Sequence, residues 1–169
     1  AYVLCLGVAS PELVKPLGLK LPIYPVRGYS VTVPITAPEK APRLGGVDEE
    51  NLLAYCPMGD RLRLTATAEI SGYSLDHTPS DFAPMMRRAK LLFGDCADFS
   101  RPTYWVGLRP MTPTGIPVVD RSPIKNLWLN TGHGHMGWTM ANGCAQILTD
   151  LIAGRKPQHT TEGLRYEQA

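Results

Sequence analysis

The sequence lacks both a long apolar run and a strong excess of charge of either sign. No apolar stretch approaches the roughly 20 residues that a helix needs to cross a bilayer. The 17 basic and 15 acidic side chains nearly balance, and no basic stripe is interleaved with aromatic residues, so nucleic acid is not an expected partner. At 169 residues, the chain is long enough to bury a hydrophobic core.

Cysteine is scarce and widely spaced. Cys5, Cys56, Cys96 and Cys144 form neither a CxxC metal pair nor a dense disulfide framework. A reducing cytoplasm is therefore the simplest expected location. The sequence also contains no GxSxG or HExxH motif and no cysteine with a nearby histidine. These absences leave hydrolysis without support.

The most informative segment runs from Asn126 to Gly154, where an apolar strand leads through Gly132-His133-Gly134-His135-Met136-Gly137 into a helix. The GxGxxG spacing lets backbone approach a negative ligand at a helix N-terminus. A self-contained dinucleotide site also needs a second parallel strand and an acidic residue about 20 positions on, and only a short polar tail follows here. The segment therefore predicts either an anion-attracting helix start or a structural glycine turn beneath a docked helix. His133 and His135 have no third ligand at metal spacing, so no metal site is expected.

Apolar periodicity predicts two main helices. The first covers residues 81–93, capped by Ser80 or Asp81, and the second ends at Gly154. The expected inward face of the first helix comprises Phe82, Met85, Met86, Ala89, Leu92 and Phe93, and that of the second comprises Ala141, Cys144, Ala145, Leu148, Leu151 and Ile152.

Alternating patterns predict a β-rich middle section. Strands are expected at 29–35, 51–57 and 61–70, the last two forming a hairpin around residues 58–60, with further strands at 104–108, 116–119 and 126–131. Pro34 should end its strand or lie at a sheet edge. A buried strand is expected from Tyr2 to Leu6, followed by a short helix capped by Ser10. A buried strand at the first residue suggests a fragment of a longer chain.

Arg109 follows the aromatic and apolar strand at 104–108. Burying a guanidinium is costly unless an anion meets it, and its planar fork matches a carboxylate. The alternatives are an ion pair with an internal Asp or Glu, or a side chain that points to water. Arg27 carries the same ambiguity.

Four sequence blocks together resemble one family: PVRGYSVTVPI, GDRLRLTATAEISGYS, WVGLRPMTPTGIPVV and the segment from residue 126 to 157. They are similar, in order, to the C-terminal part of the bacterial D-amino-acid dehydrogenases, flavoenzymes of the D-amino-acid oxidase-like family. Thr114 and Asp120 depart from the family pattern, in which Asp and Gly are usual at these places. These departures concern local turns.

The resemblance implies roles for specific residues. Arg109 would hold the substrate carboxylate, while Tyr55 and Tyr73 lie on the substrate-binding part, where one could hydrogen-bond the substrate and the alternative for each is packing. The flavin-facing set would be Arg27, Gly28, Gly132, His133, Gly134, Met136, Gly137 and Thr139. The implied chemistry is hydride transfer from the α-carbon of a D-amino acid to flavin N5 of FAD, followed by hydrolysis of the imino acid to a 2-oxo acid and ammonia.

The expected fold is α+β, with an antiparallel or mixed substrate-binding sheet, a covering helix and terminal pieces of a Rossmann-like FAD-binding domain. The expected divisions are 1–22 and 111–157 in the FAD-binding domain, 23–110 in the substrate-binding domain and 158–169 as a tail. Implied partners are a D-amino acid, the N-terminal FAD-binding portion of the same protein and a respiratory-chain acceptor, with peripheral contact at the inner membrane. A glycine- or sarcosine-type flavin oxidase and a noncatalytic binding domain remain alternatives.

Overall fold

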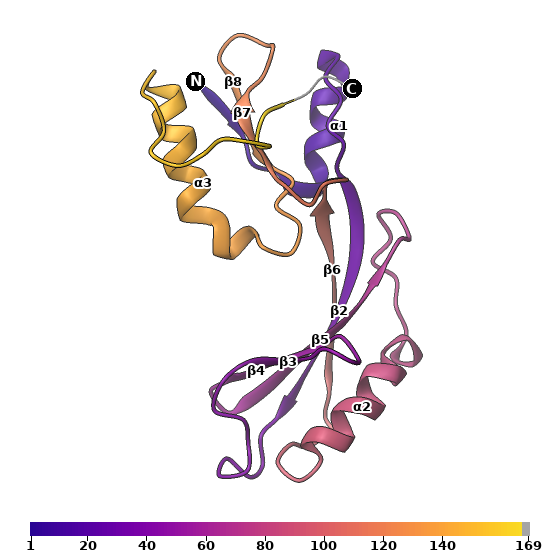
Figure 1. The fold of residues 1–169 in the computed structure, drawn as a ribbon. Coiled ribbons are helices and arrows are strands. Elements are labelled where there is room, and N and C mark those ends of the chain that lie inside the picture. Colours follow the sequence, from indigo (N-terminus) through magenta and orange to yellow (C-terminus); the bar gives the residue numbers. More distant parts are fainter. Residues whose placement is uncertain (167–169) are drawn as a thin grey trace. The chain divides into compact units, whose positions relative to one another are not determined.

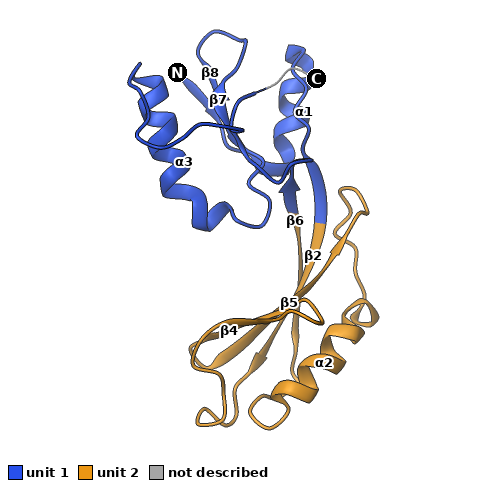
Figure 2. Cartoon of the chain, in the orientation of Figure 1, with its two compact units in different colours: residues 1–26, 109–169 blue, residues 27–108 orange. Residues whose placement is uncertain are grey.

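The computed structural model describes residues 1–166, which divide into two compact units (Figures 1 and 2). Unit 1 comprises residues 1–26 and the chain from residue 109 onward, and unit 2 comprises residues 27–108. The chain passes between the units within strands β2 (Tyr24–Pro34) and β6 (Thr103–Met111). The observed boundaries are thus 26/27 and 108/109, where we expected 22/23 and 110/111. The mixture of helices and sheets confirms the expected α+β class.

Unit 2 is built on a five-stranded sheet with the order β3-β4-β5-β2-β6. The remaining strands are β3 (Gly46–Asp48), β4 (Leu53–Met58) and β5 (Arg61–Glu69), and β4 pairs antiparallel with β5. The turn between them places Gly59 at a φ of 64°, a left-handed conformation that glycine adopts without penalty. This confirms the expected hairpin. Strand β2 ends at Pro34, as expected, although it lies inside the sheet.

Helix α2 (Ala83–Phe93) follows a short 3-10 helix, η3 (Pro79–Phe82), and covers one face of this sheet. Phe82, Met85 and Ala89 pack against alternate residues of the central strands, as expected from the helical spacing. The expected cap was wrong, because Thr78 is the N-cap of η3, where Asp81 closes a capping box with it, and the N-cap of α2 is Phe82. Leu92 was also wrongly placed, since it is 43% exposed.

Unit 1 contains a three-stranded sheet with the order β1-β8-β7, formed by β1 (Tyr2–Leu4), β8 (Leu127–Thr131) and β7 (Val118–Arg121). Strand β1 runs parallel to β8, and β7 runs antiparallel to it. The expectation of a buried first strand was wrong for Tyr2 and Val3, which are 76% and 44% exposed. They are exposed because β1 is an edge strand whose Leu4 alone enters the core.

Helix α3 (Gly137–Ile152) packs on one face of this sheet, and α1 (Ser10–Val14) lies on the other (Figure 1). The buried stripe of α3 comprises Cys144, Ile147, Leu148 and Asp150. Ala141, Ala145 and Ile152 are exposed, so the expected face was partly wrong. Asp150 can be buried because Gln146 and Arg155 donate hydrogen bonds to its carboxylate. Gly154, with a φ of 69°, ends the helix as expected.

Two polar contacts anchor segments that the sequence left uncertain. Ser10 does not cap α1, whose N-cap is Ala9; its hydroxyl instead bonds to the hydroxyl of Thr131 at 2.8 Å. The 3-10 helices η1 (Gly7–Ala9) and η2 (Lys15–Leu17) flank α1. In the tail, the Tyr166 amide donates to the Asp120 carboxylate at 3.0 Å. Asp120, which departs from the family pattern, therefore fixes the tail to β7.

Candidate functional site

The glycine turn between β8 and α3 requires glycine at two positions. Gly132 has a φ of 79° and Gly134 a φ of 56°, values that side chains with a Cβ adopt at a cost of about 1–2 kcal/mol. A Cβ on Gly132 would lie 2.7 Å from the Thr112 side chain, and one on Gly134 would lie 2.8 Å from the Met111 sulfur. The turn therefore depends on glycine for conformation at both positions and for space at Gly132.

The same turn is joined directly to the end of strand β6. The Gly134 amide donates a hydrogen bond to the Pro110 carbonyl at 2.9 Å. Arg109 precedes this proline, and it lies inside β6 because the strand continues to Met111 instead of ending at Leu108 as expected. Within unit 1, the structure thus brings together Arg109 and the glycine turn, which are separated by more than 20 residues in the sequence.

Arg109 is half-buried, and this burial lowers the pKa of its guanidinium from the ordinary value. Arginine nonetheless stays charged in proteins, because its ordinary pKa exceeds about 12. Removing part of its hydration strengthens any charge-assisted hydrogen bond that it forms. The site therefore contains a partly desolvated cation next to a backbone turn.

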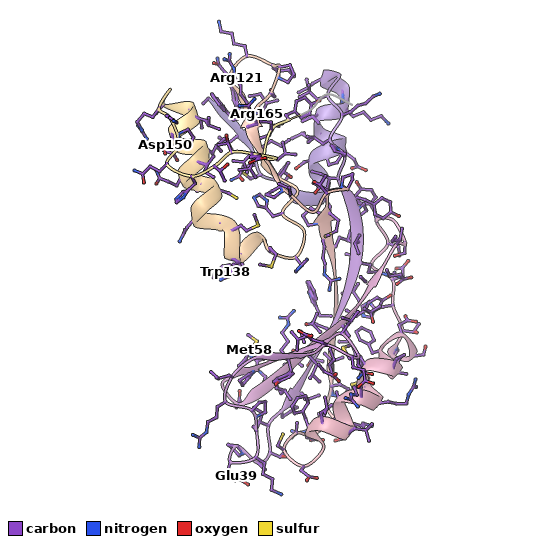
Figure 3. The ribbon with its side chains drawn as sticks, viewed as in Figure 1. Glu39, Met58, Arg121, Trp138, Asp150 and Arg165 are labelled. Carbon is purple, nitrogen blue, oxygen red and sulfur yellow. The ribbon has the colours of Figure 1, made fainter. Side chains whose placement is uncertain are left out.

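The N-terminus of α3 adds a second positive element. The N-cap is Met136, whose side chain makes no cap hydrogen bond, and the first turn contains no acidic residue. The leading amides of a helix lack intrahelical acceptors and form the positive end of its dipole. Thr139 and Met136 are exposed, and Trp138 is 96% exposed and projects from the start of α3 (Figure 3).

The two histidines of the turn differ in environment. His133 is half-buried, and burial lowers the pKa of its imidazole, which favours the neutral ring. His135 is exposed. Among residues 1–166, no group of three His, Cys, Asp or Glu side chains is placed to hold a metal ion. The positive character of this turn therefore comes from backbone amides and from Arg109.

In unit 2, Arg27 is held by an internal carboxylate. Its Nε and Nη2 atoms donate to Glu69 at 3.0 and 2.7 Å, and Nη1 donates to the Asp76 carbonyl at 2.7 Å. The Tyr29 hydroxyl donates to the same Glu69 oxygen. We call Arg27, Tyr29 and Glu69 the carboxylate cluster. An ion pair with an internal acid was one of the alternatives left open by the sequence, and it is the one that forms at Arg27. The roles of Arg27 and Gly28 at a flavin stay predictions.

The carboxylate cluster shifts the titration of its members in consistent directions. Hydrogen bonds from Tyr29 and then Arg27 lower the pKa of Glu69, and the bond to Glu69 raises the pKa of Arg27. Burial, followed by the bond to Glu69, raises the pKa of Tyr29. Glu69 is therefore held ionised and Tyr29 protonated. Through the Asp76 carbonyl, the cluster also holds the segment that follows β5.

The two candidate tyrosines occupy different environments in unit 2. Tyr55 is half-buried, with its ring centroid 5.0 Å from that of Phe93 and its hydroxyl over Gly46. These contacts are those of a packing residue. Tyr73 is 47% exposed in the segment between β5 and η3. Their roles in substrate binding remain predictions.

Sequence reasoning missed Glu69 and Tyr29 because of one irregularity in strand pairing. Tyr29 pairs with Ala66, but a register shift after Gly28 places Arg27 opposite Glu69. Without this shift, Arg27 would lie opposite Ala68. Thr67, with a φ of 66°, marks the extra residue. Its sequence context contains no glycine or proline that could have indicated the bulge.

The family model and the similar proteins of known name agree on one family. The model of the DAO family, described as FAD dependent oxidoreductase, matches residues 1–151. D-amino acid dehydrogenase 2 of Mesorhizobium japonicum is 48% identical over 166 residues, which cover 98% of this chain and 40% of the relative. D-amino acid dehydrogenase of Cereibacter sphaeroides is 49% identical over 168 residues, covering 99% of this chain and 38% of the relative. The chain thus spans about two fifths of the length of these relatives.

Solved structures show the same fold. Glycine oxidase from Geobacillus kaustophilus matches with a TM-score of 0.87 at 21% identity, covering 100% of this chain and 45% of that chain. L-proline dehydrogenase from P. horikoshii matches with a TM-score of 0.83 at 14% identity, covering 96% and 45%. The family match, the close relatives and the fold agree, so the chain belongs to the DAO family of FAD-dependent oxidoreductases.

Proposed function

We propose that the protein containing this chain oxidatively deaminates D-amino acids to 2-oxo acids and ammonia, with FAD as the hydride acceptor. The names of the close relatives support this activity. The structural observation that carries the proposal is the hydrogen bond from Gly134 to Pro110. It joins the strand that bears a carboxylate-binding candidate to a turn and helix start suited to negative charge.

Arg109 is proposed to bind the carboxylate of the amino-acid substrate. A guanidinium offers two parallel N–H donors that match the two carboxylate oxygens, which fixes orientation as well as position. Partial burial of Arg109 excludes water that would weaken this pairing. The substrate is then oriented by its acid group, while the α-carbon and its side chain are left for other contacts.

The turn and helix start fit the negatively charged edge of a reduced flavin. Gly132 and Gly134 permit close backbone approach, and the amides of Gly137 and Thr139 belong to the first turn of α3. His133 and Met136 add no negative charge to this positive end. When bound, FAD supplies the hydride-accepting ring, so the protein mainly binds, orients and stabilises charge.

Arg27, Gly28, Tyr55 and Tyr73 complete the proposed set. Because Glu69 holds the Arg27 guanidinium, we propose that Arg27 contributes by fixing the backbone of β2 around Gly28 near the flavin. Tyr73 is exposed enough to donate to a substrate, whereas Tyr55 would have to act from its packed position.

The proposed electron acceptor is a respiratory-chain component, reached by peripheral contact with the inner membrane. Among residues 1–166, no helix is both long and apolar enough to span a membrane. Assay of purified protein with added membranes or quinone tests this part separately from substrate oxidation. Reduction of oxygen instead of quinone would contradict it.

The main test uses the full-length protein. We expect it to purify with a flavin absorption spectrum that bleaches under anaerobic conditions when D-alanine is added and stays unchanged with L-alanine. Ammonia and pyruvate should form in equal amounts when a redox dye accepts the electrons. A colourless protein would favour the noncatalytic binding domain, and equal bleaching by both enantiomers would contradict the proposed substrate class.

The fold similarity to glycine oxidase favours one second candidate, an oxidase that acts on glycine or sarcosine. Such an enzyme would also use an arginine for the substrate carboxylate and a glycine turn for the flavin, so the presence of Arg109 and the glycine turn does not separate the oxidase from the dehydrogenase. Oxygen consumption with glycine or sarcosine as substrate would support this candidate. Dye reduction with D-alanine and none with sarcosine would support the dehydrogenase.

A further inference from the structure

On the face of the unit 2 sheet opposite α2, the two central strands β2 and β5 carry polar side chains. Helix α2 packs on the face that carries Val31, Val33, Leu62 and Leu64. Since side chains alternate along a strand, the opposite face carries Ser30 and Thr32 of β2 and Arg63 and Thr65 of β5. Ser30 pairs with Thr65, and Thr32 pairs with Arg63. Arg63 therefore stands next to three hydroxyl side chains, and Arg61 lies two residues away on the same face.

Arg63 is held in a defined orientation on this face. Its Nη2 atom donates to the Ser30 hydroxyl at 3.1 Å, and its guanidinium carbon lies 5.3 Å from the centroid of the Trp105 ring. Ser30 is only 2% exposed, so the hydroxyl that holds Arg63 is itself fixed in the sheet. The guanidinium is thus preorganised by a hydrogen bond and a cation–π contact.

Trp105 can adopt this position because residue 107 is glycine. A Cβ at Gly107 would overlap the six-membered ring of Trp105. The indole therefore lies along β6 over Gly107 and meets Arg63. Trp105 remains 54% exposed, so this aromatic surface is accessible in unit 2.

The charge of Arg63 is not balanced by a carboxylate of the described chain. The ion pairs recorded among residues 1–166 involve Arg27, Arg61, Arg88, Arg101 and Arg155. Arg63 is half-buried yet belongs to none of these pairs. An incoming anion would therefore gain a charge-assisted hydrogen bond without displacing an internal acid.

We propose that Arg63, Trp105 and Ser30 form a binding site for the carboxylate of a small organic acid. A carboxylate is planar and singly charged, which matches one guanidinium surrounded by neutral hydroxyls better than a dianionic phosphate does. The site lies in unit 2 and is separate from the role proposed for Arg109.

The test is titration calorimetry of the full-length protein with glutarate, which has no amino group and cannot undergo amino-acid oxidation. We expect Arg63→Gln to weaken glutarate binding by about tenfold or more, because a charge-assisted hydrogen bond is lost. Arg61→Gln is the matched control. Arg61 lies two residues away on the same strand and face, and its side chain is 61% exposed; we expect less than a twofold change.

A second variant separates binding from folding. Arg63→Lys keeps the charge but loses the planar fork, so we expect glutarate affinity between those of the wild type and Arg63→Gln. Thermal unfolding of each variant identifies any that fails to fold. If Arg63→Gln does not fold, Arg63→Lys and Trp105→Phe test the proposal, and unchanged glutarate affinity in both would overturn it.

Chemical modification of arginine tests the site in the wild-type protein. Phenylglyoxal reacts with arginine, and glutarate should slow its reaction at Arg63 but not at Arg61, as read by mass spectrometry. Absence of glutarate binding, equal effects of the two glutamine substitutions, or tighter Arg63-dependent binding of inorganic phosphate would overturn the proposed ligand class. All these readouts are independent of whether the protein oxidises D-amino acids.

Discussion

Arg27 and Arg109 are ambiguous in the same way in the sequence, but the structure places their charges in different environments. Arg27 donates to Glu69 and to a backbone carbonyl, and the bond to Glu69 raises its pKa. Arg109 is half-buried next to the glycine turn, and burial lowers its pKa. The first charge forms an ion pair within unit 2, and the second loses hydration through partial burial.

The two environments indicate different roles for the two side chains. A cation that already bonds to a carboxylate gains little from a second anion, because the first must be displaced or shared. Partial desolvation strengthens any charge-assisted hydrogen bond that a cation makes, including one to an arriving anion. Arg27 therefore suits the positioning of backbone, and Arg109 suits the grip on a substrate.

The largest effect expected from this comparison is on catalysis. Arg109→Leu in the full-length protein should lower kcat/KM for D-alanine by about 100-fold or more, since two charge-assisted hydrogen bonds are lost. Arg109→Lys keeps the charge but not the fork, so it should mainly raise KM. The rate of dye reduction measures both. Unchanged kinetics in Arg109→Leu would remove Arg109 from the substrate site.

The second prediction concerns the turn beside Arg109. Gly132→Ala should destabilise the protein by about 1–3 kcal/mol more than Gly18→Ala, because overpacking adds to backbone strain. Gly132 and Gly18 have φ values of 79° and 77°, but a Cβ added at Gly132 would have neighbours within 4 Å, whereas one added at Gly18 would have none. Urea unfolding of the full-length protein measures the difference. FAD affinity should fall in Gly132→Ala alone, and equal effects in both variants would contradict the argument.

Local patterns in the sequence predicted much of the fold. The Gly59 hairpin, the end of β2 at Pro34 and the C-terminus of α3 at Gly154 follow from the conformational preferences of single residues. The inward face of α3 followed only in part, because apolar spacing does not count the acidic Asp150, which is buried through bonds from its sequence neighbours Gln146 and Arg155. Apolar spacing therefore located the helix but fixed its rotation only roughly.

The sequence also predicted only part of the candidate site. The sequence indicated Arg109 and the glycine turn as separate features, because each has a recognisable local pattern. Their contact through Pro110 and Gly134 is long-range, and no local pattern encodes it. The carboxylate cluster depends on the bulge at Thr67, which places Glu69 opposite Arg27. Pairing register is set by the whole sheet, so residues brought together by a bulge were missed.

The third prediction tests the stabilised side of the comparison. Tyr29→Phe should lower the free energy of unfolding by about 1 kcal/mol, since a hydrogen bond to Glu69 is lost. Glu69→Gln should have a larger effect and should increase proteolytic cleavage within residues 71–78, because Arg27 would no longer be fixed against Asp76. Asp48→Asn is the matched control. It breaks the 2.6 Å pair with Arg88 elsewhere in unit 2 and should leave cleavage of that segment unchanged.

The effect of Glu69→Gln should depend on pH in a defined direction. The pKa of Glu69 is lowered in the folded protein, so its ionised form contributes stability above the unfolded pKa of about 4.3. That contribution is lost as the pH falls through the lower folded value. Unfolding curves of wild type and Glu69→Gln should therefore differ at pH 7 and converge in acid. A difference that grows on acidification would contradict the proposed role of the carboxylate.

The smallest effect is expected at Asp98, whose carboxylate also bonds to an arginine, but to one that is far more exposed than Arg27. Hydrogen bonds from Ser100 and then Arg101 lower the pKa of Asp98 to about 2. Arg101 is 69% exposed, whereas Arg27 is 11% exposed, so solvent and salt screen the Asp98 pair more strongly. Asp98→Asn should lower the melting temperature slightly at pH 7, and the difference should disappear as the pH falls from about 4 toward 2. High salt should reduce the loss in Asp98→Asn more than that in Glu69→Gln. Equal salt sensitivity would show that burial does not separate the two arginine–carboxylate pairs.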